Sequence, residues 1–197
     1  MGNYFNCHAH TMYSNIRLLD CINRPKSLID KAIELGLSGI AITDHESLSA
    51  HMEVNIYAKK LQQTNPDFKI ALGNEIYLVD ARDKGQKYYH FILLAKDAEG
   101  HKALRKLSSI AWYNSYTDRG MERVPLLKSE LAKVMSDYKG HVIATTACMG
   151  GELSTNALNM SDAEAVGDYA NAKVYYENII NFITFCTDVF GSDFNLS

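Results

Sequence analysis

The chain has 197 residues, of which 47% are hydrophobic and 22% are charged, and its formal net charge is -3. This composition is typical of one globular domain with a sizeable core. The net charge does not indicate tight nucleic-acid binding by this chain alone, so any DNA contact would rely on local positive charge, metal ions or attached domains. No apolar run is long enough to span a membrane, the first residues lack the basic segment and apolar stretch expected of a signal peptide, and the four cysteines form no CxxC pair. We therefore expect a cytoplasmic protein with no membrane partner.

Strands and helices alternate along the chain. Apolar runs predict strands at residues 4–8, 39–43, 69–79, 88–95 and 141–145. Helical patterns occupy residues 25–35, 47–62, 99–113, 126–135 and 161–190. Gly36 ends the first helix, and Gly167 is a weak point in the last one. The alternation predicts an α/β fold with a repeated βα unit, in which functional side chains gather where parallel strands end.

Two histidines follow the first predicted strand. His8 and His10 are two positions apart, so in an extended chain both rings point to the same side. Two imidazoles at a strand end are a natural seat for a transition metal, and Thr11 and Ser14 supply the polar turn that ends the strand. The pair predicts half of a metal site, although this spacing alone also fits two surface histidines.

Each later strand carries or precedes another side chain of the metal-ligand type. Asp44 and His45 follow the second strand, His90 lies in the fourth, and Cys148 follows the fifth. Glu75 lies inside the otherwise apolar third strand, where a buried carboxylate requires a cation nearby. The pattern predicts that one site collects side chains from all five strands.

These motifs resemble those of the PHP domain, the polymerase and histidinol phosphatase superfamily. The resemblance rests on residues 8–11, 43–45, 73–75 and 90–112, and it extends over essentially the whole chain. Together with residues 147–153, the last of these segments is similar to the N-terminal domain of the bacterial replicative DNA polymerase III alpha subunit, of the C-family. The resemblance implies a distorted (β/α)7 TIM-like barrel of about seven strands.

The resemblance also implies a set of metal ligands. The matching positions are His8, His10, Asp20, His45, Glu75, His90 and Cys148. Asp20 lies further from the first motif than the acidic residue of the family does, as if a short insertion intervened. Such donors suit zinc, manganese or iron, and a complete domain of the family holds up to three divalent ions.

Three further residues are expected to assist catalysis. Asp44 could orient His45 or touch a metal directly. Arg17 and Arg119 lie in predicted loops where a phosphate could be met at the barrel mouth, and Arg123 shares the second of these loops.

The family closes its metal site with a C-terminal Asp-x-His motif, which this sequence does not contain. The last residues, from Asp193 onward, read as the start of another strand. We therefore expect an N-terminal fragment of a longer polymerase chain. Loss of the final two ligands would cost at least one ion and weaken catalysis.

The function expected from the resemblance is metal-dependent phosphodiester hydrolysis, as a 3'-5' exonuclease that proofreads for a polymerase. Its partners would be a DNA 3' end, the other polymerase domains in cis and other replisome subunits. A second hypothesis is a metal-bound structural module without hydrolysis, and a third is a small-molecule phosphatase of the histidinol phosphate type. The polymerase-like residues after His90 argue against the third, and the retained ligands favour the first over the second.

The remaining ionisable residues are expected to be ordinary surface groups. His51 is predicted at the surface or at a helix cap, and His101 at a solvated position. Lys102, Arg105 and Lys106 fit a solvated helix face better than a DNA groove.

Overall fold

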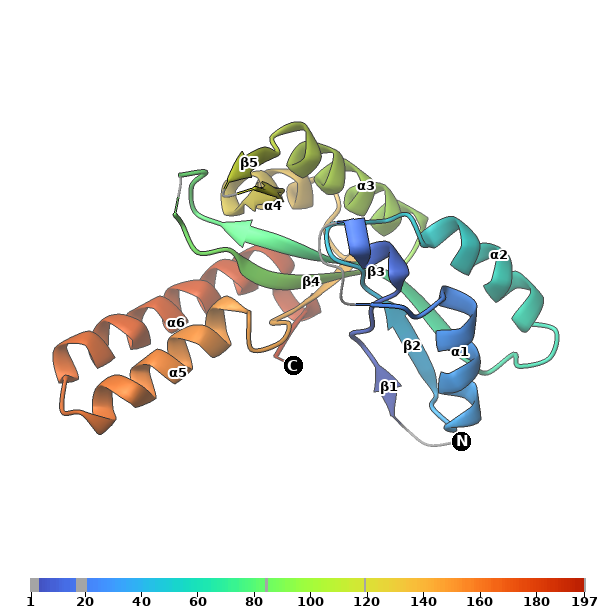
Figure 1. The fold of residues 1–197 in the computed structure, drawn as a ribbon, viewed down its shortest axis with the longest axis horizontal. Coiled ribbons are helices and arrows are strands. Elements are labelled where there is room, and N and C mark those ends of the chain that lie inside the picture. The colour runs from blue at the N-terminus through green and yellow to red at the C-terminus, as the bar shows by residue number, and fades with distance from the viewer. Residues whose placement is uncertain (1–3, 17–20, 84, 119, 197) are drawn as a thin grey trace.

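The structure is a computed structural model, which describes residues 4–16, 21–83, 85–118 and 120–196. In this part of the chain a curled half-barrel sheet forms the centre of the molecule (Figure 1). Its strands follow the order β1-β2-β3-β4-β8-β9, and β7 also pairs with β3. Their bounds are β1 (Phe5–Asn6), β2 (Gly39–Ile42), β3 (Lys69–Val79), β4 (Tyr89–Ala95), β7 (Pro125–Leu127), β8 (Val142–Thr145) and β9 (Phe194–Asn195).

The direction of β4 departs from a simple parallel repeat. β1, β2 and β3 are parallel, as predicted, whereas β4 is antiparallel to both β3 and β8. The connection 80–88 is too short for the helical crossover that a parallel pair requires. As a result, the first residues of β4 lie at the same edge of the sheet as the carboxyl ends of the parallel strands.

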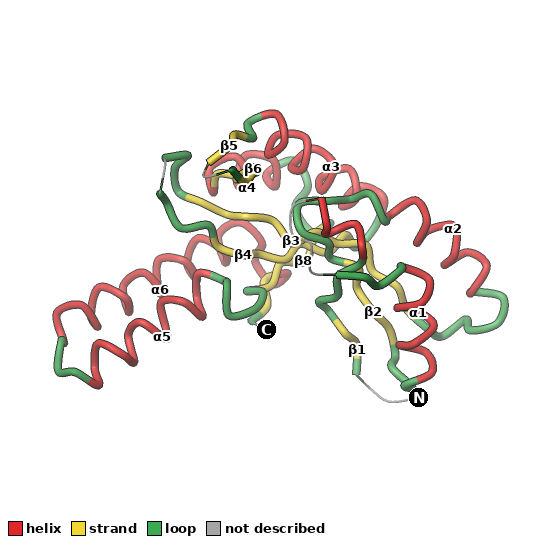
Figure 2. The backbone as a smooth tube through the Cα atoms, viewed as in Figure 1, coloured by secondary structure: helices red, strands yellow, loops and turns green. Residues whose placement is uncertain are grey.

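The helices flank this sheet (Figure 2). Their bounds are η1 (Met12–Ile16), α1 (Pro25–Glu34), α2 (His51–Leu61), α3 (Ala98–Tyr113), α4 (Lys128–Ser136), α5 (Glu152–Ala165), α6 (Tyr169–Phe190) and η2 (Gly191–Asp193). The predicted break at Gly167 is confirmed, because its φ of 77° is a left-handed conformation that favours glycine. There α5 and α6 turn back on each other and form a hairpin that projects from the sheet (Figure 1). None of the helices in the described ranges is long and apolar enough to cross a membrane.

Several elements differ from the sequence-based predictions, among them β7, two residues of which were expected in the helix 126–135. A small separate sheet pairs β5 (Tyr116–Asp118) with β6 (Met121–Arg123) in antiparallel fashion. The predicted helix 47–62 begins only at His51, because the polypeptide between β2 and α2 forms turns.

The alternation of side chains along β3 separates the core from the site. Ile76 and Leu78 are fully buried and pack with Leu104 and Leu107 of α3. Burial of such a side chain stabilises the fold by roughly 1.5–3 kcal/mol. Glu75 directly precedes Ile76 in the strand and therefore points to the opposite, concave face of the sheet.

Candidate metal centre

Glu75 is the centre of a cluster of histidines on the concave face. Its side chain is completely buried. Its Oε2 lies 2.8 Å from His8 Nε2 and 2.9 Å from His10 Nε2, and its Oε1 lies 2.6 Å from His90 Nδ1. His45 Nδ1 is 3.5 Å from Oε2. The two oxygens of one carboxylate thus face different histidines.

The topology explains why these residues meet. His8 and His10 follow β1, and His45 follows β2 and bridges to Glu75 on the neighbouring parallel strand. His90 reaches the same edge because β4 runs in the opposite direction. In barrels, functional side chains gather at the carboxyl ends of the parallel strands. Because β4 runs in the opposite direction, its first residues lie at that same edge.

Cys148 lies at the rim of this cluster, after β8. Its Sγ is 3.4 Å from His90 Nδ1 and 3.9 Å from Glu75 Oε1. The loop approaches the His90 ring closely, because a Cβ atom on Gly150 would lie only 3.0 Å from His90 Nδ1. The small residue at this position lets the thiol reach the histidine.

The structure therefore brings six of the predicted ligands together, namely His8, His10, His45, Glu75, His90 and Cys148. Asp20, Arg17 and Arg119 lie outside the described residues, so their predicted roles stay predictions.

The donor atoms form two groups that fit metal ions. One group is His8, His10 and Glu75, and the other is His45, Glu75 and His90, with the ligand atoms of each group within 4.8 Å of one another. His8 Nε2 and His10 Nε2 lie 2.9 Å apart while both face the same carboxylate oxygen. Nitrogen lone pairs and an anionic oxygen that converge in this way match the donors of transition-metal sites. Glu75 belongs to both groups and could bridge two ions.

The environment keeps Glu75 ionised. Burial by itself raises the pKa of the Glu75 carboxyl, but the hydrogen bonds from the histidine rings outweigh that effect. The groups that lower the pKa are His10, His8 and His90, together with the charge of His45, and they hold it well below its usual range. The carboxylate is therefore available as an anionic ligand.

A chain of hydrogen bonds behind the cluster fixes the ring of His10. Ser14 Oγ donates to Asp44 Oδ1 at 2.7 Å and lies 3.2 Å from His10 Nδ1. Since the hydroxyl proton is used on Asp44, His10 Nδ1 donates to Ser14, and Nε2 is the ring nitrogen that faces Glu75 and is available to a metal ion. Asp44 also accepts from the backbone N–H and the hydroxyl of Thr11, at 2.6 and 2.7 Å. These bonds place Asp44 behind the ligands.

Tyr77 is part of the site, although the sequence analysis did not identify it. Its ring stacks on His45 with centroids 5.7 Å apart and meets the edge of His90 at 5.0 Å. Its hydroxyl lies 3.3 Å from His45 Nδ1. The signal was its spacing, because a residue two positions after Glu75 on a strand shares its face.

A family model and several relatives match the sequence. The sequence matches the PHP domain family over residues 6–194, and the chain belongs to that family. It is 43% identical over 198 residues to the DNA-directed DNA polymerase of Bacillus phage SPbeta, a match that covers 95% of this chain and 15% of that protein. It is 32% identical over 200 residues to the DNA polymerase III subunit alpha of Borreliella burgdorferi, covering 98% of this chain and 15% of that subunit. The chain thus spans about 15% of the length of these relatives.

Among solved structures, an amidohydrolase from Chromobacterium violaceum aligns with 98% of this chain and 87% of its own length. The sequence identity is 14% and the TM-score is 0.40.

Proposed function

We propose that this chain is the metal-dependent phosphoesterase-type domain of a DNA polymerase of the polymerase III alpha class, and that it removes nucleotides from DNA 3' ends in proofreading. The observation that carries the proposal is the buried Glu75 carboxylate, which faces His8, His10 and His45 with one oxygen and His90 with the other. Relatives named as DNA polymerases support the replication context. The remaining polymerase domains in cis and other replisome subunits are the proposed partners.

The described residues divide the task of holding two ions. His8 and His10 would bind one ion together with Glu75, whereas His45 and His90 would bind a second ion with the same carboxylate. Cys148 lies beside His90 and offers a thiolate to the second position. Zinc, manganese or iron suits this mixture of imidazole, carboxylate and sulfur, and Asp20 is proposed as a further ligand. Such ions, when bound, lower the pKa of a water molecule and stabilise charge on a phosphodiester.

The protein would orient these ligands before any substrate arrives. Ser14 and Asp44 hold the His10 ring with Nε2 toward Glu75, so we assign Asp44 a positioning role. Tyr77 packs on His45 and restricts its ring. Arg17 and Arg119 remain the proposed contacts to the phosphate backbone, because guanidinium groups bind phosphate through paired hydrogen bonds.

A structural role is the second candidate, and one observation favours it. Glu75 is fully buried and ties together segments that follow or belong to β1, β2, β3 and β4. A metal held there would stabilise the sheet whether or not hydrolysis occurs.

A nuclease assay separates the two roles. A 3'-labelled oligonucleotide, single-stranded or mismatched at its end, is incubated with manganese or zinc and with wild type, His90→Ala or the control His141→Ala. His141 is exposed and bonds to Asp97, away from Glu75. Since the sequence has no Asp-x-His, we expect weak cleavage from this chain and stronger cleavage from a longer form that includes the motif.

In both lengths the cleavage should disappear in His90→Ala and persist in His141→Ala. If neither length releases nucleotides in a His90-dependent way with either metal, the structural role is favoured.

A further inference from the structure

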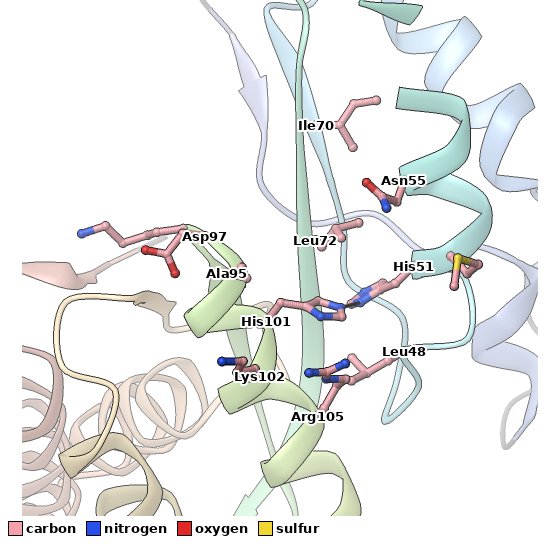
Figure 3. Close-up of a pocket in the computed structure, with 13 residues that line it drawn as sticks. Leu48, His51, Asn55, Ile70, Leu72, Ala95, Asp97, His101, Lys102 and Arg105 are labelled. Carbon is pink, nitrogen blue, oxygen red and sulfur yellow. Dashed lines mark hydrogen bonds between the residues drawn. The ribbon is translucent and has the colours of Figure 1, made fainter. Parts of the chain in front are cut away.

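A cavity lies on the face of β3 opposite to the metal centre, between α2 and α3 (Figure 3). Its volume is about 660 Å³, within the range of roughly 300–1,000 Å³ that is usual for small-molecule sites. Ile70 and Leu72 of β3 line it, and alternation places both on the side away from Glu75. The cavity is therefore separate from the proposed catalytic site.

The floor of the cavity is apolar. Leu48, Ile70 and Leu72 are only half-buried and leave hydrophobic surface open between the two helices. Met52 lies exposed at the edge of this floor, with 70% of its surface accessible. A flat apolar group placed there would remove this surface from water, which is favourable.

One wall of the cavity is basic. Lys102 and Arg105 lie three positions apart on α3, and therefore on one side of that helix (Figure 3). Lys102 pairs with Glu99 at 2.6 Å, and the lining carboxylate Asp97 is bonded to His141 at 2.7 Å. Within the described residues Arg105 forms no ion pair, so its guanidinium is available for an anion.

Two histidines complete the polar lining, and one of them is not placed as the sequence analysis predicted. His51 is 4% exposed, although it was expected at the surface or at a helix cap. Its Nε2 donates to the Gly73 carbonyl at 2.9 Å, so its Nδ1 accepts from His101 Nε2 at 3.0 Å. These bonds leave His101 Nδ1 as a hydrogen-bond acceptor, and His101 lines the cavity. The histidines supply hydrogen bonding, whereas Arg105 and Lys102 supply charge.

We propose that this cavity binds a nucleoside monophosphate, with the base on the floor formed by Leu48, Ile70 and Leu72 and the phosphate at Arg105 and Lys102. The guanidinium fork binds two phosphate oxygens, and the neighbouring ammonium balances the second charge. The apolar floor and the hydrogen-bonding wall suit a flat heterocycle better than a bare inorganic ion. The proposal does not depend on hydrolysis at the metal centre.

Calorimetric titration with deoxyadenosine monophosphate tests the proposal. The protein is first treated with a chelator, so that the metal centre holds no ion that could bind the phosphate. We expect saturable binding that Arg105→Gln weakens about tenfold or more, the loss typical of a removed charged hydrogen bond. Met52→Glu, which adds a negative charge at an exposed edge of the floor, should weaken it as well.

Lys106→Gln is the matched control, because Lys106 is the next residue on α3, bonds to Asp137 and does not line the cavity. Its affinity should equal that of wild type, with equal melting temperatures for all variants showing that each folds. Absence of saturable binding in wild type, or an equal loss in Lys106→Gln, would overturn the proposal. So would equal affinity for deoxyadenosine, which lacks the phosphate. A single-stranded oligonucleotide as the better ligand is the alternative outcome, and it is recognised by its own signature. If the oligonucleotide binds more tightly than the nucleotide, and if Arg105→Gln and Lys106→Gln weaken its binding alike, α3 carries an extended DNA-binding face in place of this pocket.

Discussion

Glu75 on β3 meets His90 on β4 with Oε1 2.6 Å from Nδ1, because the two strands run in opposite directions. His90 pairs in register with Tyr77, so Glu75 is its diagonal neighbour on the same face of the sheet. The other carboxylate oxygen is left for His8 and His10, with His45 slightly further away. One antiparallel step in the sheet thus gives a single carboxylate two sets of histidine neighbours.

Substitution of Ser14 should weaken metal binding without unfolding the protein. In Ser14→Ala the hydrogen bonds to Asp44 and His10 are lost, so the His10 ring is free to turn away. Loss of such an outer-shell partner usually lowers metal affinity by about 10–100-fold. Zinc titration against a competing chelator measures the affinity, with the exposed Ser109→Ala as control. Wild-type affinity in Ser14→Ala would refute the role of this hydrogen-bond chain.

Asp44 should contribute strongly to stability. In Asp44→Asn an amide group replaces an oxygen that accepts hydrogen bonds from Thr11 and Ser14 in a fully buried position. Leaving buried donors without acceptors costs about 1–3 kcal/mol, so we expect the free energy of unfolding to fall by about that amount. Urea denaturation measures it. The exposed Asp188→Asn should change it by less than about 0.5 kcal/mol, and an equally small effect of Asp44→Asn would contradict the account.

Bound metal should protect Cys148 from alkylation. The thiol is exposed, yet it lies 3.4 Å from His90 Nδ1, where a metal ion would hold it as a thiolate. Mass spectrometry after iodoacetamide treatment should show slow labelling of Cys148 with zinc and fast labelling with a chelator. The exposed Cys7 serves as an internal control whose rate stays constant. If both cysteines respond identically to the chelator, Cys148 is not a ligand.

Acid should destabilise the protein partly through His51. Burial lowers the pKa of His51 to about 4, whereas the unfolded chain takes up this proton near the ordinary value of 6.5. The contribution of neutral His51 to the free energy of unfolding is therefore fully present above pH 6.5 and is lost as the pH falls toward 4. This contribution amounts to about 3 kcal/mol. Urea denaturation across this range should show a smaller decline for His51→Gln than for wild type. Parallel declines would show that His51 does not titrate in this way.

Sequence reasoning located the candidate ligands that the structure brings together, because strand ends and the family motifs mark them directly. The third strand was predicted at residues 69–79 and is found there, and Glu75 within it has the buried position that its apolar neighbours indicated. The family resemblance assigned His8, His90 and Cys148 to one site. These residues are far apart in the sequence, so no local sequence pattern connects them.

What escaped prediction depends on tertiary contacts. The reversed direction of β4 follows from a short connection whose conformation has no periodic signal. His51 has a polar sequence neighbourhood but is buried by its bonds to Gly73 and His101. Tyr77 reads as an ordinary aromatic strand residue until its ring is seen against His45.

The metal content of Glu75→Gln is the most direct test of the shared carboxylate. Chelator-treated protein is titrated with zinc or manganese, and bound metal is counted by elemental analysis after gel filtration. Wild type should bind two ions, because two histidine groups share Glu75. His8→Ala should lose one ion and keep the other, whereas Glu75→Gln should weaken both. Retention of both ions by Glu75→Gln, or failure of wild type to take up metal, would contradict the account.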